Sequence, residues 1–265
     1  MVKSLSEMAV EVLSTADPME KTNLSRGYAS AWFSDPKIEI GSATPPPFPA
    51  RPDQPELRDP KNVPKRKPGS VEGRAALLHA IAHIELNAVD LHWDIIARFT
   101  DTPMPRGFYD DWVKAADEES KHFQLLQNCL SLTDRSYGDF PAHAGMWRAA
   151  DDTAHDLFAR LAIVPMVLEA RGLDVTPGMI TLFEKHNEAE TVAALETIYA
   201  EEVGHVAYGS KWFHYLCGRN ELDPKPKFHE MVQTYFPGGL KPPFNDEKRA
   251  EAGLPLDFYW PMAAE

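Results

Sequence analysis

The sequence contains little of what marks several common protein classes. Only Cys129 and Cys217 occur among 265 residues, and both lie in apolar, helix-like segments. Two such cysteines exclude a Cys-rich metal cluster and suit reduced, buried thiols in a cytoplasmic protein better than a secreted disulfide framework. The sequence also lacks a GxGxxG loop and a P-loop, so nucleotide-dependent chemistry has no support.

Long hydrophobic runs and an excess of positive charge are missing as well. No segment approaches the roughly 20 apolar residues that span a bilayer, and Glu7 and Glu11 interrupt the first 13 residues. We therefore expect a soluble, cytoplasmic protein with no membrane partner. The formal net charge of −13 at pH 7 disfavours nucleic acid as a partner, because phosphate binding needs Lys and Arg. Lys65-Arg66-Lys67 is interpreted as a solvated charge run.

Proline is abundant but unevenly placed. Of 23 prolines, nine lie between Pro45 and Pro68 and seven between Pro224 and Pro261, which leaves only five within residues 71–217. Because proline removes backbone donors and disfavours helix, we predict a helical domain over residues 70–217. Residues 1–69 are predicted to form N-terminal helices and a Pro-rich wrapping segment, and residues 218–265 a Pro-rich extension packed on the bundle.

Apolar spacing and cap residues predict where the helices lie. Two short helices are expected over residues 5–13 and 18–33, the second with Asp17 as its cap and Pro18 at its first position. Longer helices are expected over residues 70–99, 107–132, 145–171 and 189–217, the first with Ser70 as its cap and the third with a kink at Pro165. A short helix is expected over residues 177–186. Helices of about 40 Å are typical of bundles, so the predicted fold class is an all-α four-helix bundle.

Two Glu-x-x-His pairs, Glu119-x-x-His122 and Glu202-x-x-His205, lie 83 residues apart, each near the middle of a predicted helix. Residues i and i+3 project from one helical face, so each pair can offer a carboxylate and an imidazole to one metal ion. Composition alone would produce about one such pair, so the spacing by itself decides little. Their central positions in alternate helices favour metal binding over coincidence.

The intervening helices each contain one glutamate in an apolar run, Glu85 and Glu169. A short turn between the first two long helices would make them antiparallel and bring Glu85 level with Glu119. A carboxylate among large apolar side chains is costly to bury unless a metal or an Arg neutralises it, although a solvated or ion-paired position explains either residue alone equally well. With the two pairs, these residues complete the ligand set of a four-helix di-metal protein. The predicted metal ligands are Glu85, Glu119, His122, Glu169, Glu202 and His205.

Three further residues are candidates for supporting roles around this centre. His92 shares a helical face with Glu85 and could be an extra ligand or hold one in place, with a satisfied core histidine as the simpler alternative. Arg171 could offset carboxylate charge or cap its helix near Gly172, and Tyr208 could approach the site or pack in the core.

Seven blocks of the sequence carry a resemblance to a known family. They are Arg51-Pro-Asp-Gln-Pro-Glu-Leu, His79-Ala-Ile-Ala-His-Ile-Glu85-Leu-Asn, Tyr109-Asp-Asp-Trp112, Glu119-x-x-His122-Phe, Thr153-Ala-His155-Asp, Val164-Pro-Met-Val-Leu-Glu-Ala-Arg-Gly-Leu-Asp-Val-Thr-Pro177 and Glu202-Val-Gly-His205-Val. These blocks resemble a bacterial ferritin-like family filed as a domain of unknown function, number 455. The resemblance spans nearly the whole chain and implies a ferritin-like fold with a di-metal centre, without a settled substrate. A short block around Glu169-Ala-Arg171 also resembles di-iron tRNA hydroxylases.

The ligand set predicts two iron ions as the cofactor, with manganese or a mixed manganese–iron pair as alternatives. An O2-dependent oxidase or oxygenase acting on a small molecule is the first functional hypothesis, and an electron-donor protein is a possible partner. The alternatives are a metal-binding or metal-storage protein without turnover, and an RNA-modifying hydroxylase. The chain is expected to be a monomer or a small homo-oligomer.

Overall fold

The computed structural model describes residues 3–64 and 67–264, so Lys65 and Arg66 of the charge run lie outside the described residues. The chain divides into two compact units, Met1–Trp147 and Arg148–Glu265. Throughout the described residues the regular structure is helical, and the β-pairing there consists of isolated bridges. The all-α prediction is confirmed, whereas the assignment of residues 70–217 to one domain stays a prediction.

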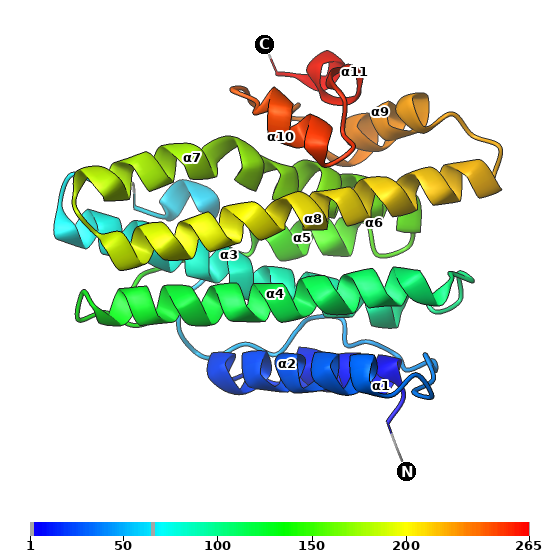
Figure 1. The fold of residues 1–265 in the computed structure, drawn as a ribbon, viewed down its shortest axis with the longest axis horizontal. Coiled ribbons are helices and arrows are strands. Elements are labelled where there is room, and N and C mark those ends of the chain that lie inside the picture. The colour runs from blue at the N-terminus through cyan, green and yellow to red at the C-terminus, as the bar shows by residue number, and fades with distance from the viewer. Residues whose placement is uncertain (1–2, 65–66, 265) are drawn as a thin grey trace. The chain divides into compact units, whose positions relative to one another are not determined.

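The first unit is built from two pairs of helices. The long helices α3 (Val71–Arg98) and α4 (Arg106–Ser131) form a hairpin and pack along each other. The shorter helices α1 (Leu5–Ser14) and α2 (Pro18–Ser34) cover them, with α1 against α3 and α2 against α4 (Figure 1). All four helices lie within about two residues of their predicted bounds.

The predicted caps explain why these helices begin where they do. The Asp17 side chain accepts a hydrogen bond from the Glu20 amide, with Pro18 at the first helical position. The Ser70 hydroxyl accepts one from the Gly73 amide at the start of α3. Each cap satisfies an amide that the first turn of a helix leaves without a backbone partner.

The Pro-rich segment of the first unit has one 3-10 turn, η1 (Pro60–Asn62). It is held by hydrogen bonds rather than by regular structure. The Ala50 amide donates to the Leu13 carbonyl at 2.7 Å, and the Arg51 guanidinium donates to the Asn87 amide oxygen at 2.7 Å. The segment thereby joins the end of α1 to the middle of α3.

The body of the second unit is built from four consecutive helical segments, two short and two long. They are α6 (Leu157–Ile163), a π-helical segment η2 (Val164–Glu169), α7 (Ala170–Lys185) and α8 (Ala189–Arg219). Helix α8 packs along α7 and η2. Helix α5 (Gly145–Asp152) spans the boundary between the two units.

The prediction of one helix over residues 145–171 is wrong at both ends. The chain leaves the helix after Asp152, and Asp156 caps a new helix by accepting a hydrogen bond from the Phe158 amide. Beyond Gly172 the helix continues to Lys185, through a proline that was predicted to start a separate helix. A proline inside a helix leaves the carbonyl four residues earlier without its donor. Here the Asn245 side-chain amide donates to that carbonyl, on Leu173, at 3.2 Å.

The C-terminal extension contains helices that were not predicted. They are α9 (Pro224–Tyr235), α10 (Asp246–Glu251), α11 (Leu256–Tyr259) and a 3-10 turn, η3 (Trp260–Met262). Helix α9 starts with Pro224 at its first position, where proline is favoured, and Asp223 caps it. It packs on α6 and α8, while α10 packs on α7 and α8.

One carboxylate fastens α10 to α7. Both Asp174 oxygens accept hydrogen bonds from the Arg249 guanidinium, at 2.8 and 2.7 Å, and both side chains are buried. The Asn245 amide donates to Asp174 at 2.9 Å, and Arg171 donates at 3.3 Å. The Arg249 guanidinium also lies over the rings of Phe244 and Tyr259. This buried pair is the main polar link between the extension and the body of the second unit.

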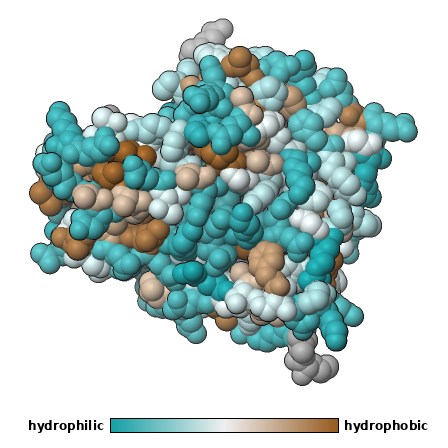
Figure 2. Space-filling model, viewed as in Figure 1, coloured by the Kyte–Doolittle hydropathy of each residue, from teal (hydrophilic) through white to brown (hydrophobic). Residues whose placement is uncertain are grey.

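Of the helices in the described residues, none has the length and apolar character needed to cross a membrane. The face seen in Figure 2 is mainly hydrophilic, with hydrophobic residues in separate patches. Cys129 and Cys217 are free and buried, as the apolar segments around them predicted, and their redox state stays a prediction. Burial raises the pKa of the Cys217 thiol to about 11.

Candidate metal centre

In the first unit, α3 and α4 bring together three of the predicted ligands, Glu85, Glu119 and His122. All three side chains are buried, and each can offer a ligand atom within 4.8 Å of the others. The His122 Nδ1 atom lies 3.1 Å from Glu85 Oε2 and 3.4 Å from Glu119 Oε2. The hairpin thus sets Glu85 level with the Glu-x-x-His pair, as the sequence predicted.

These separations suit ligand atoms that share one ion. Oxygen and imidazole nitrogen ligands lie roughly 2.0–2.2 Å from a metal, so two of them on one ion are roughly 3.0–3.6 Å apart. The contacts of His122 with Glu85 and Glu119 fall within this range.

The electrostatics of Glu85 also favour a cation at this position. Burial raises the pKa of its carboxyl well above the usual range, and the neighbouring Glu119 carboxylate raises it further. The hydrogen bond to His122 opposes these effects only in part. A buried carboxylate pair of this kind favours either a proton or a metal ion.

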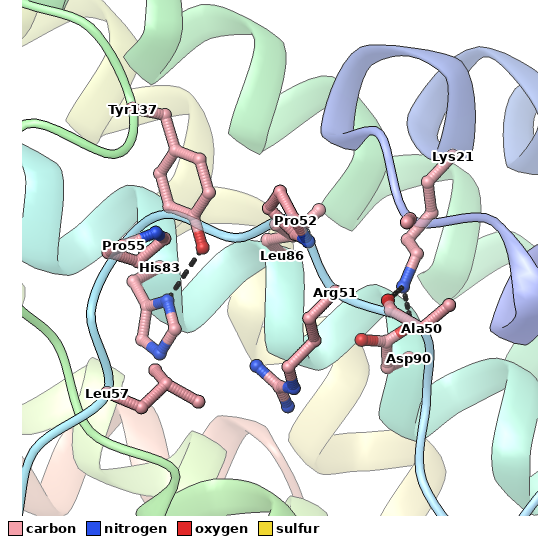
Figure 3. Close-up of a pocket in the computed structure, with 11 residues that line it drawn as sticks. Lys21, Ala50, Arg51, Pro52, Pro55, Leu57, His83, Leu86, Asp90 and Tyr137 are labelled. Carbon is pink, nitrogen blue, oxygen red and sulfur yellow. Dashed lines mark hydrogen bonds and ion pairs between the residues drawn. The ribbon is translucent and has the colours of Figure 1, made fainter.

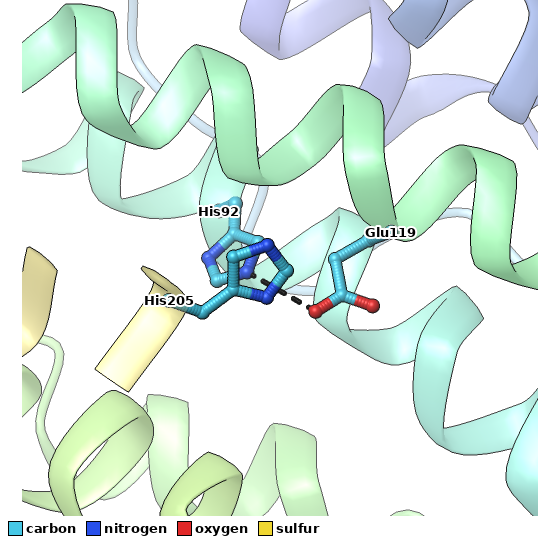
Figure 4. A group of neighbouring side chains, drawn as sticks. All are labelled: His92, Glu119 and His205. Carbon is cyan, nitrogen blue, oxygen red and sulfur yellow. Dashed lines mark ion pairs between the residues drawn. The ribbon is translucent and has the colours of Figure 1, made fainter. Parts of the chain in front are cut away.

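His92 lies on the same face of α3, two turns beyond Glu85. Its Nε2 atom is 3.6 Å from Glu119 Oε1, the oxygen that does not face His122 (Figure 4). The imidazole stacks on the Trp112 ring with centroids 5.3 Å apart. His92 is therefore a direct neighbour of Glu119, and its role as a ligand or a supporting residue stays a prediction.

The second unit holds the other three predicted ligands, Glu169, Glu202 and His205. All three are buried, and each can offer a ligand atom within 4.8 Å of the others. The His205 Nδ1 atom lies 3.7 Å from Glu202 Oε1. Both Glu-x-x-His pairs therefore direct Nδ1 toward their own glutamate, and each is joined by one glutamate from the adjacent helix.

The π-helical segment η2 ends at Glu169, one of the predicted ligands. Segments of π-helix are rare and often mark functional sites, because the extra residue per turn re-aims the side chains that follow. Pro165 lies within η2 and is packed against Gly209 of α8. A Cβ atom at Gly209 would lie 2.5 Å from Pro165 Cγ and 2.6 Å from Pro165 Cβ. Only glycine permits this close approach.

We expect Gly209→Ala to destabilise the protein by about 1–3 kcal/mol, because the rigid proline ring must move away from the added methyl group. Gly218→Ala on the same helix is the matched control, since a Cβ there meets nothing within 4 Å. It should leave stability unchanged or raise it by up to about 1 kcal/mol. Urea unfolding of the two variants measures the difference, and equal stabilities would contradict the packing argument.

The other two residues predicted to support the centre are Tyr208 and Arg171. The Tyr208 ring centroid is 6.5 Å from that of His205, and its side chain is half-buried. Arg171 is directed to the C-terminal extension, where it donates to the Lys241 and Pro243 carbonyls at 2.8 and 3.0 Å. These two hydrogen bonds hold the C-terminal extension against α7.

Sequence reasoning missed a polar cluster beneath the Pro-rich segment, on α2 and another face of α3. Lys21 and Asp90 form a buried ion pair at 2.5 Å, and the Lys21 ammonium also donates to the Ala50 carbonyl (Figure 3). The cluster borders a cavity of about 20 Å³, enough for a single water molecule. Asp90 lies in an apolar run, as Glu85 does, and that signal could have found it.

His83 completes this cluster in one defined tautomer. Its Nε2 atom lies 3.1 Å from the His143 carbonyl and must donate to it, so Nδ1 accepts from the Tyr137 hydroxyl at 2.7 Å. Burial lowers the pKa of His83 to about 3, which keeps the ring neutral. The cluster therefore anchors the Pro-rich segment and is separate from the carboxylate–imidazole set.

Comparisons with known proteins give a family and one relative of similar length. A family model described as "Protein of unknown function (DUF455)" matches residues 14–260. An "Uncharacterized protein" of Haemophilus influenzae is 42% identical over 210 residues, covering 77% of this chain and 73% of the relative. No solved structure matches the chain.

Proposed function

The chain belongs to the family described as "Protein of unknown function (DUF455)", and we propose a function for it from the side chains of its candidate metal centre. The protein contains buried His and Glu groups able to bind metal. The proposal is that they form a carboxylate-bridged centre for two iron ions, in a ferritin-like bundle, and that this centre is an O2-dependent oxidase or oxygenase.

One observation carries the proposal. Each unit contains a Glu-x-x-His pair with its Nδ1 atom turned toward its own glutamate, and a further buried glutamate from the adjacent helix joins each pair. The order along the chain is Glu, Glu-x-x-His, Glu, Glu-x-x-His, which is the order of ligands in four-helix di-metal carboxylate proteins. This order supports assigning both sets to one centre.

The donor types support iron. Hard carboxylate oxygens with imidazole nitrogens suit iron and manganese, whereas structural zinc sites are built mostly from cysteine and histidine. The two cysteines of this chain are Cys129 and Cys217, neither of which belongs to the ligand groups. Four carboxylates would balance the charge of two divalent ions.

Bound ferrous ions would supply electrons that reduce O2, and O2 would be the oxidant for the substrate. The chain's own residues would hold and shield them. The Glu85 and Glu119 carboxylates lie close enough to repel each other, and this repulsion favours the uptake of a cation. The buried Trp112 ring, which stacks on His92, limits access of bulk water on that side. A small organic substrate fits this setting better than RNA, because the chain has a net charge of −13.

Oxidation of the reconstituted protein tests the proposal. Protein loaded anaerobically with Fe(II) is mixed with O2, and O2 uptake and Fe(II) oxidation are followed with and without a chemical reductant. An oxidase or oxygenase should consume O2 repeatedly when reductant is supplied, with iron staying at about two per chain. A storage protein would instead accumulate ferric iron well beyond two per chain.

The control is His155→Ala, which removes a histidine of the second unit that bonds to the Tyr235 hydroxyl rather than to the ligands. This variant should behave like the wild-type protein. Failure of the wild-type protein to react with O2 after loading would refute the oxidase proposal, even if iron is bound.

A further inference from the structure

We infer that His92 is itself a metal ligand, and that Glu119 bridges two metal positions through its two oxygens. The inference rests on the proposed metal binding and makes it more specific. It adds a third imidazole to the six predicted ligands and assigns it to the ion that His122 does not contact.

The two oxygens of Glu119 face different imidazoles. Oε2 lies 3.4 Å from Nδ1 of His122, and Oε1 lies 3.6 Å from Nε2 of His92. A carboxylate that bridges two ions offers one oxygen to each, and each ion then has its own nitrogen ligand. Glu119 has this arrangement within the first unit alone, with Glu85 on the His122 side.

The contact between His92 and Glu119 fits shared coordination better than a direct hydrogen bond. Hydrogen bonds from nitrogen to oxygen are 2.7–3.2 Å long, so 3.6 Å is too long for a strong one. Two ligand atoms on one ion, each roughly 2.0–2.2 Å from it, are separated by about this amount. His92 therefore leaves room for an ion between its nitrogen and the carboxylate.

The position of His92 is also fixed in the way that a ligand needs. The ring is buried and stacks on Trp112, with an interplanar angle of 27°. His92 follows Glu85 by seven residues, close to two helical turns, so both project from one face of α3. Packing against Trp112 holds the ring before any metal arrives.

A third imidazole has consequences for metal choice. The neutral ring adds a donor without adding negative charge, so the charge balance of four carboxylates with two divalent ions is kept. Imidazole favours iron over manganese more strongly than carboxylate does. His92 is thus expected to bias one of the two positions toward iron.

Anaerobic titration of purified protein with Fe(II), and separately with Co(II) as a spectroscopic probe, tests the inference. The wild-type protein should bind two ions per chain. His92→Ala should bind one ion with nearly unchanged affinity and the other at least about 10-fold more weakly. Added imidazole should restore the weakened site and the Co(II) absorption bands, because it can occupy the space left by the ring.

His79→Ala is the matched control, because His79 is also a buried histidine of α3 and accepts a hydrogen bond from the Gly138 amide outside the ligand set. It should lose stability but bind both ions normally. His92→Gln serves if the alanine variant does not fold, and it should weaken the same site.

The outcomes separate this inference from the proposed function. A wild-type protein that binds neither Fe(II) nor Co(II) would overturn both. Two ions bound by His92→Ala or His92→Gln with unchanged affinities and spectra would overturn the role of His92 and leave the six-ligand centre standing. Weakened binding that imidazole does not restore, with unchanged Co(II) bands, would also count against direct ligation.

Discussion

Glu119→Ala is expected to reduce metal binding from two ions per chain to less than one, the largest functional effect of any single substitution. Glu119 offers one oxygen toward His122 and the other toward His92, so its removal deprives both positions of a ligand at once. By contrast, Glu85→Ala removes a ligand from the His122 side only and should spare one ion.

Thermal unfolding with and without Fe(II) gives a second measure of this effect. A ligand present at 100 times its Kd stabilises the folded state by about 2.7 kcal/mol for each site. The wild-type protein should gain this stabilisation when Fe(II) is added, and Glu119→Ala should gain almost none. Without metal, removing Glu119 also relieves its repulsion with Glu85, which offsets part of the packing loss.

Asp117→Ala is the control, because Asp117 lies on the same helix but pairs with Arg26 at the surface. It should bind two ions and respond to Fe(II) as the wild-type protein does. Retention of both ions by Glu119→Ala would contradict the bridging role.

Asp174→Ala is expected to destabilise the protein by about 3–5 kcal/mol, the largest structural effect. The substitution leaves the buried Arg249 guanidinium without its carboxylate, and an uncompensated buried charge is costly. It also removes the acceptor of the Asn245 amide, whose side chain supports the helix at Pro177. We expect the C-terminal extension to detach first.

Urea unfolding and limited proteolysis test this prediction, with cleavage expected between α9 and the C-terminus. Asp257→Ala is the matched control on the same extension. Its pair with Lys225 is exposed and screened by solvent, so its loss should leave the stability of the protein almost unchanged. Similar stability losses in the two variants would show that the Asp174–Arg249 pair does not hold the extension.

Local signals made much of the fold predictable. Asp17 and Ser70 cap the helices they were predicted to cap, since a cap depends on residues within one turn. Helix α7 was misjudged because its proline is accommodated by Asn245, about 70 residues away in sequence. A contact between residues so far apart in sequence cannot be detected from the local spacing of residue types.

In the candidate site, too, local features could be predicted from the sequence and contacts between distant residues could not. Glu85, Glu119 and His122 could be placed together because the i, i+3 spacing and a short hairpin determine their positions along the axes of α3 and α4. The buried Lys21–Asp90 pair could not, because it depends on how the first two helices dock on α3. The direction of the His92 ring likewise depends on Trp112, which only the packed structure reveals.

The most direct test of the central claim is the ratio of tightly bound iron to protein after anaerobic Fe(II) loading and removal of excess metal. The account predicts two irons per chain in the wild-type protein. It also predicts fewer than one in a variant that combines Glu119→Ala with His205→Ala. A wild-type ratio near zero, or an unchanged ratio in the double variant, would contradict it.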